Sequence, residues 1–217
     1  VYLGQAKQTV NAPDGSVGSS QVAASIITGQ TALASEPADT DEFLVSDAGT
    51  LKRIDYSLIK GGGITEADQW RLTANSNTGS NSDITSNWER NDGTGYGSIG
   101  TGLTESSGIF SFPSTGKYLI NAQFAAQMEA NDVNVEVEFM VTTNNSSYTT
   151  VAYLLCGNGG GNNNTRNSLA QSYILDVTDT SNVKFKFHTG SFAGSTTVVG
   201  DTNTQISGFT SIRLGDT

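Results

Sequence analysis

The sequence predicts an all-β protein: a C-terminal jelly-roll sandwich, preceded by an extended N-terminal thread and a small β-hairpin module. Two observations lead to this prediction. From residue 64 onward, apolar residues recur at every second position in several runs, which is the period of a strand with one buried face. Turn-rich segments, built from many of the 25 glycines and from Ser, Thr and Asn, separate these runs. No convincing amphipathic helix interrupts them, so a sandwich or jelly roll is expected.

The N-terminal part divides into two predicted segments. Residues 1–30 form an extended stalk or assembly segment, because small polar residues follow a Pro-Asp-Gly turn and cannot bury a core alone. Residues 31–63 form a hairpin connector, in which two short apolar strands flank an Asp/Gly turn at 46–50. Asp55 is expected to cap one helical turn that follows. The run Gly61–Gly63 is a linker, and we place the boundary of the head domain, residues 64–217, there.

Six strands are predicted in the head, at residues 115–125, 133–141, 151–155, 169–177, 183–188 and 205–214. The run 133–141 alternates most regularly, and Val151, Tyr153 and Leu155 are expected to repeat its inward row. The last strand is apolar on both faces, with Phe209 opposite Ile212. A strand of a lone sandwich normally shows one face to water. We therefore predict that Phe209 is buried against another subunit, and the alternative is a single exposed Phe.

Composition excludes several partners and sites. The net charge of −10 leaves no basic face for nucleic acid or for an anionic membrane surface. No apolar run approaches the length that crosses a bilayer, and no secretory leader is readable. With one His and one Cys, a structural zinc site is ruled out, and we expect no metal and no cofactor. Two oxygen-rich segments, 91–92 and 201–203, are interpreted as turns rather than calcium sites.

No residue pattern supports catalysis, so we expect no enzyme activity. Glu136 and Glu138 share the polar face of their strand and are interpreted as surface charges rather than an acid–base pair. His188 follows Lys184 and Lys186 on a polar face, and no serine stands in a nucleophile-elbow context. Cys156 is interpreted as a small buried hydrophobe.

The order of the predicted strands indicates which end of the sandwich binds a ligand. Successive loops of an antiparallel sandwich alternate between its two ends, so residues 128–132, 157–167 and 191–204 should share one end. We predict low-affinity glycan contact there, through amides, a guanidinium and one exposed ring. The residues are Asn162, Asn163, Asn164, Arg166 and Phe192. The alternative is that these loops are only solvated.

Two motifs resemble those of the complement C1q and tumour necrosis factor jelly-roll family. The stretch 108–118, after Asn91–Tyr96, is similar to that family's Phe-x-x-Pro-x-x-Gly-x-Tyr signature. The closing stretch 206–214 resembles its terminal Ser-Gly-Phe strand. The resemblance covers roughly residues 68–215 and implies a compact homotrimer, so the subunit interface predicted at Phe209 would be that of a trimer.

Residues 38–54 resemble a connector of tail-fibre and other virion proteins from marine and cyanobacterial phages, and residues 13–21 are similar to stretches of the same proteins. This implies a bacteriophage structural protein on the tail or capsid surface, joined to other virion proteins through its N-terminal region. A tail fibre or spike with a receptor-binding head is the first hypothesis. The alternatives are a capsid head fibre or decoration protein, a secreted C1q-like adhesin or lectin, and, least favoured, a capsule depolymerase.

Overall fold

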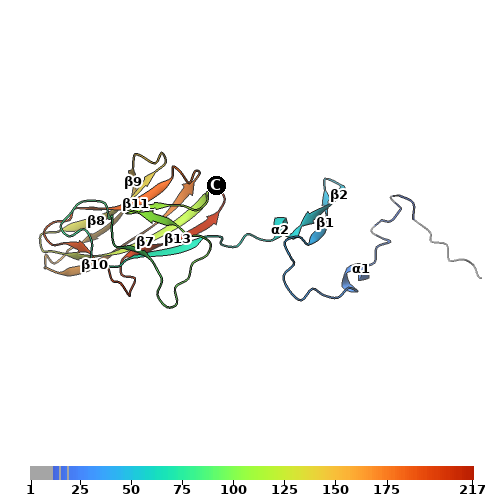
Figure 1. Cartoon of the computed structure of the whole chain (residues 1–217), viewed down its shortest axis with the longest axis horizontal. Helices are drawn as coiled ribbons and strands as arrows, with labels where there is room; N and C mark the ends of the chain where they lie inside the picture. Colours follow the sequence, from blue (N-terminus) through green and yellow to red (C-terminus); the bar gives the residue numbers. More distant parts are fainter. Residues whose placement is uncertain (1–11, 15, 19) are drawn as a thin grey trace, which may run out of the picture. The chain divides into compact units, whose positions relative to one another are not determined.

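The computed structural model describes residues 12–14, 16–18 and 20–217. Part of the predicted thread, residues 1–11 with 15 and 19, lies outside the described residues. The chain forms two compact units with their boundary between Gly61 and Gly62 (Figure 1). No helix of the described part is long and apolar enough to cross a membrane.

The first unit contains the predicted hairpin, β1 (Glu42–Asp47) and β2 (Thr50–Asp55). Its two-residue turn has φ of 49° at Ala48 and 85° at Gly49, the left-handed backbone that matches the twist of a hairpin. The short helix α2 (Tyr56–Ile59) follows, with Asp55 at its N-cap position but without a side-chain capping bond. A second short helix, α1 (Ser25–Thr28), interrupts the segment that the sequence predicts as extended.

The described residues of the first unit form no core of their own in a single chain. Among residues 12–61 the described part contains no buried residue. Both faces of the hairpin are apolar, because Phe43 pairs with Ile54 on one face, while Leu44 and Leu51, 76% and 70% exposed, lie on the other. A lone two-stranded hairpin is marginally stable in water. The first unit therefore needs a neighbour to bury these side chains.

The second unit is a sandwich of two antiparallel sheets. The first sheet has the order β10-β7-β13-β3-β4, with β12 paired to β7, and the second sheet has the order β5-β6-β11-β8-β9. The strands are β3 (Ala67–Leu72), β4 (Trp88–Arg90), β5 (Thr104–Ser106), β6 (Ile109–Ser111), β7 (Gly116–Met128), β8 (Asn134–Thr142), β9 (Thr149–Gly157), β10 (Thr165–Val177), β11 (Lys184–Gly190), β12 (Thr197–Val198) and β13 (Gly208–Gly215). The chain crosses between the two sheets several times, for example from β6 to β7, from β7 to β8 and from β9 to β10, and the predicted all-β fold class is confirmed.

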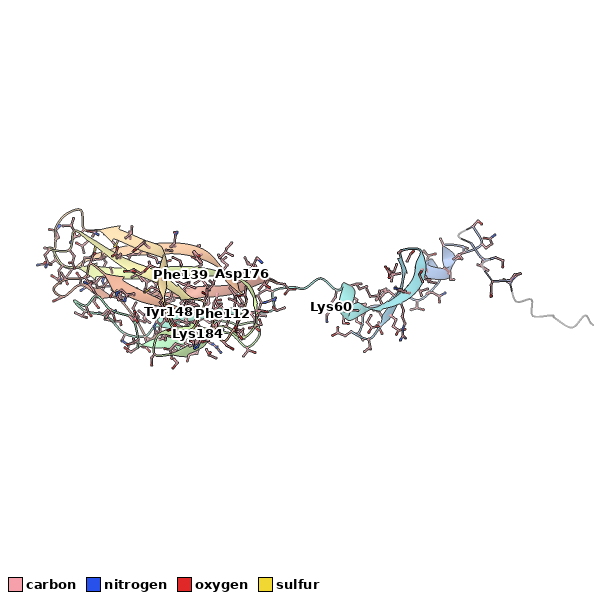
Figure 2. All side chains as sticks on the ribbon, turned by 90° about the horizontal axis from the view of Figure 1, so that it is seen from above. Lys60, Phe112, Phe139, Tyr148, Asp176 and Lys184 are labelled. Atoms are coloured by element: carbon pink, nitrogen blue, oxygen red, sulfur yellow. The ribbon has the colours of Figure 1, made fainter. Side chains whose placement is uncertain are left out.

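Aromatic rings from both sheets fill the centre of the sandwich. Phe112 and Phe139, two residues of this core, are labelled in the head in Figure 2. Phe209 of β13 is 1% exposed, and its ring centroid lies 4.8 Å from that of Phe110 and 5.3 Å from that of Phe185. The prediction that Phe209 lies in a trimer interface is therefore wrong, because its ring is already buried between the two sheets of its own subunit. The outer face of β13 carries Ile212 and the 55% exposed Leu214 instead.

The close packing of β13 against its neighbouring strands explains the Ser-Gly-Phe motif. A Cβ on Gly208 would lie 2.0 Å from the carbonyl oxygen of Trp70 on β3, so only glycine lets the two strands approach. Ser207 Oγ accepts a hydrogen bond from the Ala125 amide at 2.9 Å. The motif thus fixes β13 between β3 and β7, and aims Phe209 at the core.

A register shift explains why the residues predicted to face inward on β9, Val151, Tyr153 and Leu155, do not all do so. Phe139 pairs with Ala152 and Met140 with Thr150, so Val151 is an extra residue. Because a one-residue shift exchanges the two faces of a strand, Leu154 is buried while Tyr153 and Leu155 are 52% and 60% exposed.

Replacing Phe209 by alanine tests the core assignment. We expect the free energy of unfolding to fall by about 3–5 kcal/mol, because a buried ring is lost and a cavity remains. Urea unfolding of the full chain, followed by tryptophan fluorescence, measures this change. The control is Leu155→Ala, at an exposed site, which should change stability by about 0.5 kcal/mol or less. A Phe209→Ala chain that unfolds at the parent urea concentration contradicts the assignment.

Candidate functional site

Hydrogen bonds join the three loops that strand counting places at one end. The Ala130 amide donates to Asn163 Oδ1 at 2.9 Å, and Asn158 Nδ2 donates to the Glu129 carbonyl at 2.9 Å. The Ala193 amide donates to Asp132 Oδ2 at 3.2 Å. The loops between β7 and β8, between β9 and β10, and between β11 and β12 therefore form one surface.

The predicted binding residues at this end are only partly available. Asn162, Asn163, Asn164 and Arg166 are exposed. The Asn163 and Asn164 side-chain oxygens accept bonds from Ala130 and Gln127, and Arg166 Nε donates to Gln127 Oε1 at 2.9 Å. The prediction of an exposed ring at Phe192 is wrong, because this side chain is 4% exposed and belongs to the core. Glycan contact at the four polar residues stays a prediction.

A second polar cluster lies on the outer face of the second sheet, where residues 82–84 run beside β11. The Ile84 amide donates to the Phe187 carbonyl, and the Thr189 amide to the Ser82 carbonyl, each at 2.9 Å. These two bonds place Asp83 directly opposite His188. The sheet thereby gains a short additional edge that carries a carboxylate.

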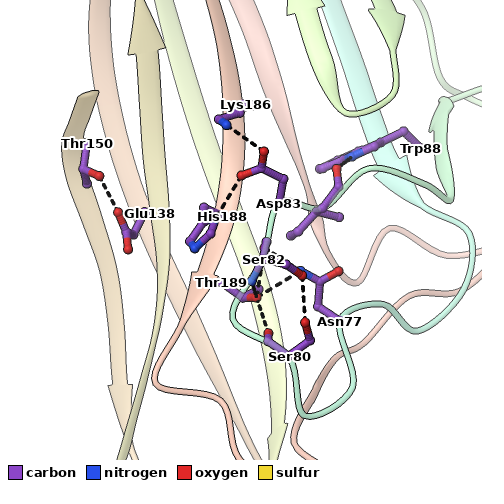
Figure 3. Close-up of polar contacts among 11 residues, drawn as sticks. Asn77, Ser80, Ser82, Asp83, Trp88, Glu138, Thr150, Lys186, His188 and Thr189 are labelled. Atoms are coloured by element: carbon purple, nitrogen blue, oxygen red, sulfur yellow. Dashed lines mark hydrogen bonds and ion pairs between the residues drawn. The ribbon is translucent and has the colours of Figure 1, made fainter. Parts of the chain in front are cut away.

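Asp83 binds two side chains of β11 (Figure 3). Its Oδ2 accepts from Lys186 Nζ at 2.6 Å, and its Oδ1 lies 2.8 Å from His188 Nδ1. Burial acts to raise the pKa of Asp83, but the bonds to Lys186 and His188 outweigh it and hold this pKa below its ordinary value. The carboxylate therefore stays ionised near neutral pH and fixes both basic side chains.

Tyr148 completes the cluster from the loop between β8 and β9. Lys186 Nζ lies 4.4 Å from the centroid of its ring, a cation–π distance. Burial and the nearby charge of Asp83 raise the pKa of Tyr148, so its hydroxyl stays a neutral hydrogen-bond donor. Lys186 is thus held between a carboxylate and an aromatic ring, with 17% of its side chain exposed.

Asp83, Lys186 and His188 line an open depression of about 600 Å³. We call it the β11 depression, and its lining residues are Asn81, Ser82, Asp83, Thr85, Met140, Lys186 and His188. Its volume lies within the range of small-molecule sites. Most of its lining groups are polar, and Met140 contributes an apolar patch.

The loop behind the depression is fixed from two directions. Trp88 Nε1 donates to the Ile84 carbonyl at 2.8 Å from the core side. Thr189 Oγ1 donates to the Ser80 carbonyl at 2.7 Å, and Asn77 Nδ2 donates to Thr189 Oγ1 at 2.9 Å (Figure 3). The β11 depression therefore has a preformed wall rather than a free loop.

The other residues considered for chemistry have structural partners. Burial raises the pKa of the Cys156 thiol to about 11, and its sulfur contacts Met128 Sδ at 3.8 Å. Asp92 pairs with Arg71 at 2.9 Å, and Asp201 accepts two backbone amides of its own turn. Within the described part of the chain, no group of three or more His, Cys, Asp or Glu side chains is arranged to hold a metal ion.

Sequence reasoning identified Lys186 and His188 as neighbours on a polar face but interpreted the face as merely solvated. It missed Asp83, Asn81 and Tyr148, because their proximity comes from long-range pairing across 105 residues between Asp83 and His188. The only signal in the sequence is that the single histidine stands two residues after a lysine on a predicted strand.

Comparison with solved structures supports the architecture. The chain is similar in fold to "Eiger TNF from S. frugiperda", with 13% identity, 71% of this chain and 96% of that chain covered, and a TM-score of 0.53. Murine APRIL in a crystal structure at pH 5.0 matches with 10% identity, 69% and 98% coverage and a TM-score of 0.50. No protein-family model and no curated protein matches the sequence. At such identities the likeness shows the fold alone: a tumour-necrosis-factor-like jelly roll.

The PRD1 vertex protein P5 also aligns, over 71% of this chain and 100% of that chain at 16% identity. Its TM-score of 0.42 is too low to support an argument about this protein.

The paired carboxylate predicts a pH-dependent effect of Asp83→Asn. The folded pKa lies below the ordinary value of 3.8, so the carboxylate stabilises the fold above that pH. This stabilisation is lost as the pH falls through the folded pKa. The urea midpoint of Asp83→Asn should therefore lie below that of the parent at pH 7, and the difference should shrink below about pH 4.

The control for this series is Asp176→Asn, which removes an exposed carboxylate 3.9 Å from Lys117. It should change the urea midpoint little at pH 7. A difference between Asp83→Asn and the parent that stays constant from pH 7 to pH 2.5 contradicts the assigned pairing.

Proposed function

We propose that this protein is a homotrimeric structural protein of a bacteriophage virion, a tail fibre or spike whose jelly-roll head contacts the host surface. The observation that carries the proposal is the first unit, which buries no described side chain in a single chain yet exposes apolar residues on both hairpin faces. Three copies around one axis would cover these faces. The resemblance of residues 38–54 to phage virion connectors supports the virion setting.

The head offers a second surface for assembly. Four apolar residues form a row across the outer face of the first sheet, one on each of β10, β7, β13 and β3. They are Ile174, Leu119, Ile212 and Ala67, paired in register. We call this the outer apolar row. Ile174 is 59% exposed, and an exposed apolar row of this kind is a favourable contact surface between subunits.

The proposed role is binding rather than catalysis. Asp83 orients the His188 ring, as in a hydrolytic triad, but a triad also needs a hydroxyl bonded to the other imidazole nitrogen. Thr189 Oγ1, next to His188, donates to the Ser80 carbonyl at 2.7 Å. Ser82 Oγ, next to Asp83, bonds Ser80 Oγ at 2.8 Å and lies 3.4 Å from Asn77 Nδ2. In the described part of the chain neither hydroxyl makes a hydrogen bond to His188. The geometry supports recognition of a ligand by a fixed polar surface.

Light scattering tests the trimer. The full chain should have a mass of three times 22.7 kDa. Ile174→Asp should convert it to a smaller species, because a charge in the outer apolar row would be desolvated between subunits. Val133→Asp is the matched control, at a 75% exposed site in the loop before β8, and should leave the trimer intact. A stable parent monomer at micromolar concentration contradicts the proposal.

Adsorption tests the virion role. Purified chain should reduce adsorption of the phage that encodes it, and an antibody against residues 68–215 should label the tail. Labelling of the capsid instead would identify a head fibre or decoration protein. Absence of label from the particle would contradict any virion role.

A further inference from the structure

The β11 depression has hydrogen-bonding capacity that the fold does not use. An ammonium can donate three hydrogen bonds, and Lys186 donates one of them to Asp83. His188 bonds Asp83 through Nδ1, and among the described residues its Nε2 has no partner. Asn81 Oδ1 accepts the Phe192 amide at 2.7 Å, which orients its NH₂ group as a donor. Donors and acceptors therefore stand side by side on a fixed wall.

The charge of the depression disfavours an anion as its ligand. Among the lining residues the Asp83 carboxylate is paired with the Lys186 ammonium, so no unpaired ammonium faces a ligand. Glu138, which accepts a hydrogen bond from the Thr150 hydroxyl, lies just beyond the lining, directly opposite His188 in the register of β8 and β11. Phosphate, sulfate or an acidic sugar would be repelled by these carboxylates. A strongly cationic ligand is also disfavoured, because Asp83 is already neutralised by Lys186.

The remaining match is a neutral molecule with many hydroxyl groups. Each sugar hydroxyl can donate to a carboxylate and accept from an ammonium or amide, which is the mixture of groups that this depression presents. Met140 provides an apolar patch for the C–H groups of a pyranose ring. The depression faces outward from the second sheet, opposite the side that carries the outer apolar row.

We propose that the β11 depression binds a neutral hexose unit of a surface glycan, with Asp83, Lys186 and His188 bonding its hydroxyl groups. This inference rests on the proposed function, since it supplies the host contact of the head. Each site is shallow and its affinity is low. Three copies on one particle strengthen attachment through effective concentration.

The single histidine of the chain makes the test specific. Its imidazole signals in a ¹H–¹⁵N NMR spectrum of the full chain come from His188 alone. The probes are the methyl glycosides of glucose, galactose, mannose, fucose and N-acetylglucosamine, with glucuronate, N-acetylneuraminate and inorganic phosphate as anionic comparisons. We expect at least one neutral glycoside to shift these signals saturably, and the anions to leave them in place.

Two variants and one control examine the contacts. Lys186→Met should weaken binding of the active glycoside about tenfold, the loss of one charge-assisted hydrogen bond. Thr85→Val changes an exposed lining residue and keeps its side-chain shape, so it should weaken binding of the glycoside less than Lys186→Met does. It still tests the contribution of the lining residues to binding if Lys186→Met fails to fold. Lys184→Met is the matched control on the same face of β11. Lys184 borders a different hollow with Glu105, so binding should be unchanged.

Three results would overturn the inference: no neutral glycoside shifts His188, an anion shifts it instead, or Lys184→Met weakens binding as much as Lys186→Met. These results are separable from failure of the proposed function. A trimeric chain that blocks phage adsorption without any response at His188 contradicts this site alone. A chain that binds the glycoside but is monomeric contradicts only the assembly.

Discussion

The structure depends on burial of aromatic rings between the two sheets of a single chain. Trp88 is half-buried and packs against this cluster, with ring centroids 5.1 Å from Phe110 and 5.8 Å from both Phe187 and Phe209. Aromatic pairs at such distances add to the free energy gained by burying their surface. The core of the head is thus filled by side chains from both of its own sheets.

The same contact positions the candidate binding surface. While its ring packs in the core, the Trp88 indole N–H holds the Ile84 carbonyl, and Ile84 bonds β11 through its amide. Asp83, the residue before Ile84, therefore faces outward at a fixed place beside His188. Because successive side chains of a strand point to opposite faces, the buried aromatic cluster on one face fixes the position of the polar cluster on the other.

The first unit differs from the head in this respect. It has strands and a tight turn but no buried side chain among its described residues, so local backbone preference forms the hairpin without a core to stabilise it. The two units thus differ: the head buries a core of its own, whereas in the proposed trimer the hairpin would be stabilised by assembly. This difference is the physical basis of the proposed fibre.

The sequence allowed the long strands and the hairpin to be predicted, because alternation and turn residues are local signals. The phase of β9 was predicted wrongly, since the extra residue at Val151 is a property of its pairing with β8. The strands β4 to β6 and β12 were missed, because two or three residues show no period. β3 was missed because the charged residues Asp68 and Arg71 are buried in it, which removes the apolar alternation. Phe209 was placed in a subunit interface and Phe192 at the surface, since the sequence of a strand or loop does not reveal which side its partner sheet covers. Asp83 and His188 meet only through the tertiary fold.

The most direct test of this account is an experimental structure of the full chain in solution by electron cryomicroscopy. The account predicts three heads around one axis, with the outer apolar row of the first sheet turned toward the neighbouring subunit and the β11 depression open to solvent. It also predicts that Phe209 stays inside each subunit. A monomer, or a trimer in which a neighbouring subunit covers Asp83 and His188, would contradict it.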